Sequence, residues 1–154
     1  MAEAPIPDAL RLIALDDDDL AVISANLQDA VVRAADLAFL PRARRFALLA
    51  SRFDWVKAAE GRMERCRTGL HFDAVTQVAF TGFKPSDPDT VLNLLSIGFE
   101  QQEAPGGVVT LTFSGGAGIR LNVECIDAQM RDIGPRWATK AKPGHGIDDE
   151  PRGE

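Results

Sequence analysis

The stretch VVTLTFSGGAGIRLNVECIDAQMRDIG, residues 108–134, decides the fold prediction. It predicts a hairpin, and after the hairpin the spacing of its apolar residues changes from that of a strand to that of a helix. Apolar residues alternate with polar ones in both arms, which is typical of strands with one buried face. Ser114-Gly115-Gly116 separates the arms and supplies the turn. The apolar positions of the two arms are Val109, Leu111, Phe113, Ile119, Leu121 and Val123. We therefore expect two antiparallel strands that bury one common face.

The period of the apolar residues becomes helical after Glu124. Ile126, Met130 and Ile133 recur at i, i+4 and i+7, and Gly134-Pro135 follows them as a stop signal. A helix this short is not stable alone, so it must lay its apolar stripe on the preceding sheet. The stretch thus predicts an antiparallel sheet or barrel that is closed by a C-terminal helix.

A run of four aspartates at residues 16–19 stands directly before a helical apolar stripe. The stripe consists of Leu20, Ile23 and Leu27. This arrangement predicts a helix through about Ala30, because carboxylates at a helix N-terminus accept free amide hydrogens and favour the helix dipole. A calcium loop is the alternative. It is disfavoured because calcium loops space their oxygen ligands apart and carry a turn glycine, and this run does neither.

Six further runs have the composition of strands, and turn or loop residues separate most of them. They are residues 10–15, 31–40, 46–55, 64–73, 74–83 and 91–99. We expect 31–40 and 46–55 to form a hairpin around the connector Pro41–Arg45. We expect 64–73 and 74–83 to form a second hairpin.

These elements predict one α+β domain over residues 10–137. Its core is a predominantly antiparallel sheet, or a partly closed barrel, of about seven to eight strands, with one N-terminal helix and one C-terminal helix. An open antiparallel sheet with both helices on one face is the alternative. Residues 1–9 are expected to be a flexible N-terminus. The polar residues 138–154 are expected to be a disordered tail, because they bury too little to offset the entropy of ordering.

Composition and charge narrow the class of protein. The chain has 154 residues, 45% of them hydrophobic, and a formal net charge of -6, which argues against nucleic-acid binding because duplex-binding proteins carry an excess of Lys and Arg. Its two cysteines, Cys66 and Cys125, lack the spacing of a metal or redox motif. The sequence shows no signal peptide and no apolar run of membrane-spanning length, so we expect a cytoplasmic protein.

Residues that could carry catalysis are scarce. The histidines are His71 and His145, and His145 lies in the expected tail, so a small enzyme would have to use His71 with a carboxylate. On the predicted strand His71 shares a face with Arg65 and Arg67, whose positive charges suit a general base poorly. The glycine-rich run 114–118 leads into a strand and not into a helix, so it indicates a hairpin turn and not a phosphate site. We therefore expect a non-enzymatic binding or adaptor domain with no catalytic residue, no cofactor and no metal.

A basic segment is the feature with a direct chemical implication. Residues 31–67 contain nine Lys and Arg against four Asp and Glu, a net +5, whereas the rest of the chain carries -11. The arginines on the first predicted hairpin and its connector are Arg33, Arg42, Arg44, Arg45 and Arg52. Because the arginine fork suits carboxylate and phosphate groups, we expect a small anion or an acidic protein partner to bind at Pro41–Arg45 and the strands that it joins. A solvated, edge-protecting run of charge is the alternative.

Five short stretches, taken as a set, resemble one protein family. They are residues 12–16 (LIALD), 23–30 (ISANLQDA), 44–48 (RRFAL), 52–55 (RFDW) and 123–126 (VECI). Over about Leu10 to Lys142 the chain is similar to a bacterial family of uncharacterised proteins, domain of unknown function 2948. The resemblance implies a family and a cytoplasmic bacterial setting, without an activity.

The predicted order of strands followed by a C-terminal helix is similar to that of the pleckstrin-homology-like barrel. Arg33, Arg42 and Arg44 loosely resemble the basic phosphoinositide signature of that fold, although Arg33 stands at the start of a strand and not beside the loop. The resemblance concerns element order and supports no assignment of lipid binding.

Overall fold

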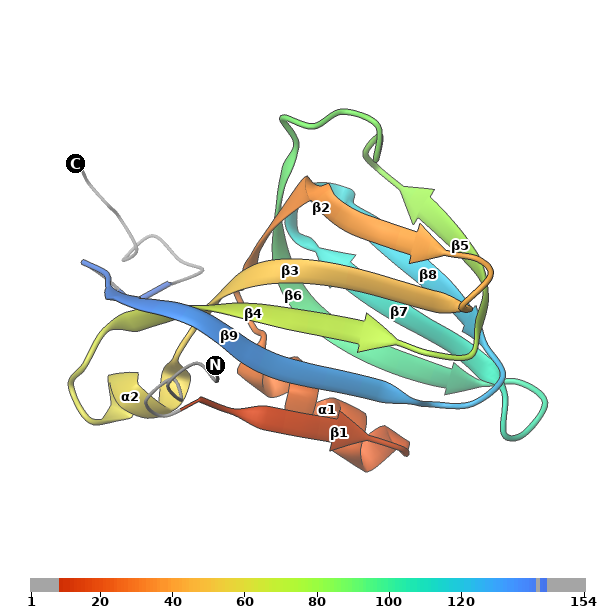
Figure 1. Cartoon of the computed structure of the whole chain (residues 1–154), viewed down its shortest axis with the longest axis horizontal. Coiled ribbons are helices and arrows are strands. Elements are labelled where there is room, and N and C mark those ends of the chain that lie inside the picture. The colour runs from red at the N-terminus through yellow and green to blue at the C-terminus, as the bar shows by residue number, and fades with distance from the viewer. Residues whose placement is uncertain (1–8, 141, 144–154) are drawn as a thin grey trace, which may run out of the picture.

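The computed structural model describes residues 9–140 and 142–143. Within them, nine strands and two short α-helices follow one another along the chain (Figure 1). The elements are β1 (Arg11–Ala14), α1 (Asp17–Asn26), β2 (Val31–Leu40), β3 (Arg45–Phe53), α2 (Trp55–Ala59), β4 (Glu64–Phe72), β5 (Val75–Thr81), β6 (Val91–Gln101), β7 (Gly107–Phe113), a 3-10 turn (Ser114–Gly116), β8 (Gly118–Val123) and β9 (Ala128–Ala138). Most of the two predicted terminal segments, 1–9 and 138–154, lies outside the described residues.

The strands form one antiparallel sheet, in which strands distant in sequence lie side by side. Their order is β1-β9-β4-β3-β2-β6-β7-β8-β5, so β1 and β5 are the two edges and the sheet does not close. Figure 1 shows that the sheet curls until β3, β4 and β9 lie in front of β6 and β7, and the buried core residues come from both layers. The prediction of a barrel of about seven to eight strands with an N-terminal and a C-terminal helix is therefore wrong.

The predicted C-terminal helix is instead strand β9, which pairs with β4 on one side and with β1 on the other. Its buried positions, Ala128, Met130 and Asp132, alternate with exposed or half-buried ones, which is strand period. The third inward residue, Asp132, is a carboxylate, so the inward residues of β9 are not all apolar. When only apolar residues are counted, Ile126, Met130 and Ile133 have the spacing of a helix. Ile133 faces outward and is 39% exposed.

The hairpin predictions are confirmed in two places and wrong in one. β7 and β8 pair across the Ser114–Gly116 turn, and all the apolar positions predicted to face inward are buried. β2 and β3 pair with Phe39 opposite Phe46. The predicted pairing of residues 64–73 with 74–83 does not form, because β3 and β9 occupy both edges of β4. β5 crosses instead to the far edge of the sheet, beside β8.

The predicted N-terminal helix is confirmed as α1, and aspartates cap it as expected. The side chain of Asp16 accepts a hydrogen bond of 2.8 Å from the amide of Asp19, and the side chain of Asp19 accepts one of 3.2 Å from the amide of Leu15. Leu20 and Ile23 of the helix are fully buried. The helix packs against β1 and β6 and so covers one end of the core.

Candidate functional site

Strands β3, β4 and β9 turn one face toward the core and the other toward solvent. On the solvent face, paired positions across the three strands are Ala47, His71 and Gln129 in one row and Leu49, Gly69 and Arg131 in the next. The small residues at positions 47 and 69 leave this face hollow, because side chains on one face of a sheet stand side by side and these two are short. Strand pairing therefore fixes a hollow with polar side chains around it.

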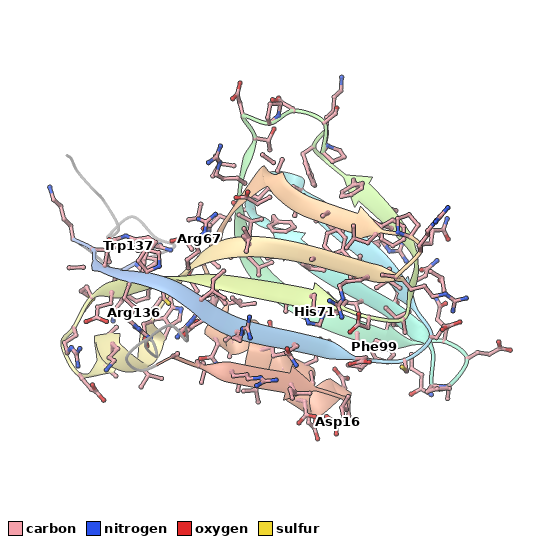
Figure 2. All side chains as sticks on the ribbon, viewed as in Figure 1. Asp16, Arg67, His71, Phe99, Arg136 and Trp137 are labelled. Carbon is pink, nitrogen blue, oxygen red and sulfur yellow. The ribbon has the colours of Figure 1, made fainter. Side chains whose placement is uncertain are left out.

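The hollow is a groove of about 600 Å³ that is open to solvent, and we call it the outer groove. Residues of the solvent face that line it are Arg45, Ala47, Leu49, Gly69, His71, Asp73, Gln129, Arg131 and Ile133. Figure 2 shows His71 on β4, toward the opposite end of the sheet from Trp137. An added Cβ at Gly69 would lie 3.9 Å from the Leu49 side chain and 4.0 Å from the carbonyl oxygen of Arg131, so the floor of the groove has room for a ligand.

Arg45 and Asp73 form an ion pair in the outer groove. Arg45 donates from Nε to Asp73 Oδ1 at 2.7 Å and from Nη2 to Oδ2 at 3.3 Å. This hydrogen bonding raises the pKa of the Arg45 guanidinium, against a smaller opposing effect of burial. His71 Nδ1 lies 3.5 Å from Asp73 Oδ2 and has no hydrogen-bond partner among the described residues. The groove thus holds a carboxylate beside an imidazole whose Nδ1 is shielded from solvent.

Two arginines stand opposite each other beside the floor of the outer groove, and we call them the Arg11–Arg131 pair. Arg131 on β9 pairs in register with Arg11 on the edge strand β1, and both residues are exposed. Within residues 9–140 and 142–143, neither guanidinium has a carboxylate partner. Like charges directly opposite each other on neighbouring strands destabilise a sheet, so an anion between them would relieve the repulsion. A carboxylate or a phosphate fits this place, because the planar arginine fork binds such groups through two hydrogen bonds.

Arg52, one of the five predicted binding arginines, points toward the core and is only 2% exposed. Its Nε and Nη2 donate to the two carboxylate oxygens of Asp132, each at 2.7 Å. Asp132 also accepts hydrogen bonds from Thr68 Oγ1 at 2.8 Å and from the amide of Leu10 at 2.9 Å. Arg136 lies 3.6 Å from the same carboxylate. Arg52 is therefore held in a buried ion-pair network, where a partner on the surface cannot reach it.

Of the other predicted arginines, Arg42, Arg44 and Arg45 lie at the turn that leads into β3, whereas Arg33 lies apart from them. Arg44, in the turn between β2 and β3, forms an exposed ion pair of 3.0 Å with Glu124, and Arg42 is exposed in the same turn. Arg33 is exposed near the start of β2, at the far end of that strand from the turn. Of the five arginines, Arg45 alone lines the outer groove.

The sequence does not single out Arg11, Gly69 or Arg131 as site residues. Arg131 lies in the segment that apolar periodicity assigns to a helix, and the pairing of β1 with β9 joins the two ends of the sheet-forming sequence. The strand alternation of β9 is the signal that would place Arg131 outward. It becomes visible only when Asp132 is counted as a buried residue.

Metal-binding and thiol chemistry find little support in the side chains that the structure describes. No group of three or more His, Cys, Asp or Glu side chains in residues 9–140 and 142–143 is placed to hold a metal ion. Burial raises the pKa of the Cys66 thiol, so the thiolate that would react is disfavoured. Over the same residues, the helices are too short or too polar to cross a membrane.

Comparison with known proteins identifies a family. No curated protein and no solved structure matches the chain. A family model described as a protein of unknown function, DUF2948, matches residues 10–145, which is most of the chain and confirms the resemblance seen in the sequence. The chain therefore belongs to the DUF2948 family of proteins of unknown function.

Proposed function

We propose that this protein is a non-enzymatic binding domain whose outer groove holds a carboxylate-bearing segment of an acidic protein partner. The observation that carries the proposal is the Arg11–Arg131 pair, two exposed guanidinium groups that have no carboxylate partner within the described part of the chain. A single carboxylate between them could accept charge-assisted hydrogen bonds from both, and such bonds are about twice as strong as neutral ones. The proposal moves the expected binding site from the connector Pro41–Arg45 to the groove, where Arg45 takes part.

The form of the outer groove favours an extended peptide segment over a small enclosed ligand. The groove is open, and Ala47, Leu49 and Gly69 give it an apolar floor. Small-molecule sites usually enclose most of the ligand, which an open groove does not do. An acidic segment with apolar side chains would place these on the floor and a carboxylate at the Arg11–Arg131 pair, as pockets for alternate side chains do in other peptide-binding sheets.

The proposed binding unit is a single domain of residues 10–137 in a bacterial cytoplasm. The family resemblance supports this setting. The protein has a net charge of -6, whereas the outer groove presents the Arg11–Arg131 pair. An acidic partner would therefore be attracted to the groove and repelled by the rest of the surface.

Arg131→Gln is expected to weaken the binding of an acidic peptide to an unoccupied outer groove by about tenfold or more, because one of the two guanidinium donors and its charge are lost. A capped peptide of repeated Val-Val-Glu-Glu serves as the probe, because a valine and the glutamate two residues after it point to the same side of an extended chain, and calorimetry measures its dissociation constant. Arg120→Gln is the matched control, since Arg120 is also an exposed strand arginine but lies on β8. Equal affinities of the wild type and both variants for the probe would contradict the proposal.

An enzymatic role for His71 is the second candidate, favoured by its distance of 3.5 Å from Asp73. A general base is usually oriented by a hydrogen bond to such a carboxylate, but here Arg45 already engages both oxygens. Incubation with a panel of ester, amide and phosphate substrates distinguishes the two roles. Turnover that disappears in both His71→Gln and Asp73→Asn would establish an enzyme and overturn the non-enzymatic proposal.

A further inference from the structure

We infer that residues 147–150 of this chain, Ile-Asp-Asp-Glu, compete with the partner for the outer groove and occupy it when no partner is bound. The inference rests on the proposed function and names a regulator of the same site. Residues 147–150 lie outside the described part of the chain, whereas every residue of the groove lies inside it.

Residues 147–150 combine acidic and apolar side chains, as the outer groove requires of its ligand. The segment offers three consecutive carboxylates to the Arg11–Arg131 pair, and Ile147 directly before them suits the apolar floor. In an extended segment Ile147 and Asp149 point to the same side, about 7 Å apart. Ile147 can therefore lie over Leu49 while Asp149 reaches toward the two guanidinium groups.

The chain between the sheet and the segment is long enough to reach the groove. β9 carries Arg131 and ends at Ala138, about 23 Å from the groove at about 3.3 Å per residue. Residues 139–148 span up to about 33 Å when extended. Gly144 and Gly146 lie in this stretch and suit the reversal of direction that the chain must make.

Attachment to the same chain makes even a weak contact effective. A short flexible linker gives an effective concentration of about 1 mM. If the segment binds the groove with a dissociation constant of about 100 µM, about nine grooves in ten are occupied and a competing peptide binds about tenfold more weakly. Partners that carry more carboxylates or bind more tightly would thus displace the segment, whereas weaker partners would not.

The test compares the full wild-type chain with a charge-neutral variant of the segment, using the glutamate and valine peptide as the probe. The substitutions are Asp148→Asn, Asp149→Asn and Glu150→Gln. This variant is expected to bind the probe about tenfold more tightly than the wild type, because its own segment no longer competes. Without the probe, its amide resonances at Gly69 and Arg131 should differ from those of the wild type.

A second variant controls for net charge. It carries Asp89→Asn, Glu100→Gln and Glu103→Gln, which remove the same charge from exposed residues of another part of the chain. Its affinity for the probe should equal that of the wild type. A gain as large as that of the segment variant would reveal a general effect of net charge and overturn the inference.

The remaining outcomes separate the inference from the proposed function. Equal affinity of the wild type and the segment variant for the probe, with weaker binding in Arg131→Gln, would overturn the inference and support the groove as a binding site. Arg131→Gln weakens the binding of the segment as well as that of the probe, so its full effect on the probe is measured in the segment variant, where the segment does not compete. Failure of the probe to bind the segment variant, or binding to it that an added Arg131→Gln does not weaken, would overturn the proposed function and the inference together.

Discussion

Asp132→Asn is expected to lower the free energy of unfolding by about 3–5 kcal/mol, because the buried guanidinium of Arg52 loses the carboxylate that binds it through two hydrogen bonds and keeps only Asp54, at 3.7 Å, as a counter-charge. Arg52 is 2% exposed, and both of its hydrogen bonds to a carboxylate end on Asp132. Asparagine has nearly the size of aspartate, so the loss would not come from a cavity. Urea denaturation of the variant measures the change. Asp89→Asn, at an exposed position, is the control and should change stability by about 0.5 kcal/mol or less.

The same ion pair determines how the stability of the wild type should depend on pH. Burial alone would raise the pKa of Asp132, but hydrogen bonds from Arg52, the Leu10 amide and Thr68 outweigh burial and hold that pKa below its ordinary value. A carboxyl whose folded pKa is depressed contributes stability above its unfolded pKa, about 3.9, and loses this contribution as the pH falls through the folded value. Stability should therefore fall more steeply below about pH 4 in the wild type than in Asp132→Asn. Parallel pH profiles, or nearly equal stabilities at neutral pH, would contradict this role of Asp132.

Gly69→Leu is expected to weaken binding of the acidic probe by about 100-fold, or about 2.8 kcal/mol, because the leucine side chain would fill the floor of the outer groove. The strand should accept this residue. A Cβ at position 69 meets nothing closer than 3.9 Å, and the backbone there does not have the left-handed conformation that requires glycine. Calorimetry with the probe measures the affinity in the Asp148→Asn, Asp149→Asn and Glu150→Gln background, where the segment does not compete, and circular dichroism checks that the fold is retained.

Gly98→Leu is the matched control for that experiment. Gly98 is also a strand glycine, on β6, where an added Cβ meets nothing within 4 Å. It lies outside the outer groove, so this variant should bind the probe like the wild type. A folded Gly69→Leu variant with wild-type affinity would mean that the ligand does not use the floor of the groove.

The fold could be predicted where the inward residues of a strand are all apolar. The hairpin of β7 and β8 satisfies this condition, and a glycine turn separates its arms. The same reasoning gave a helix in place of β9, because the inward residue Asp132 is a carboxylate. Its burial is possible only through Arg52, which lies 80 positions away in the sequence. No local pattern contains that information, so the sequence predicted a C-terminal helix beside a sheet or partly closed barrel of about seven to eight strands.

The candidate site could be predicted only in part, for a related reason. Arg45 and His71 lie in the outer groove. Strand alternation within its own segment places His71 outward, and Arg45 belongs to the polar connector that the sequence predicts before residues 46–55. Arg11 and Arg131 come together only through the pairing of β1 with β9, which local patterns do not reveal. Conversely, Arg33 is close to the turn arginines in sequence but not in space, because most of an extended strand separates them.

Chemical-shift mapping of the acidic probe on the uniformly ¹⁵N-labelled protein shows directly where a partner segment binds. The largest amide shifts are expected at Gly69, His71 and Arg131, which strand pairing brings together in the outer groove. The shifts should shrink as salt is added, because the charges involved are exposed. Shifts centred on Arg42 or Arg33, with none at Gly69, would contradict the outer groove as the binding surface.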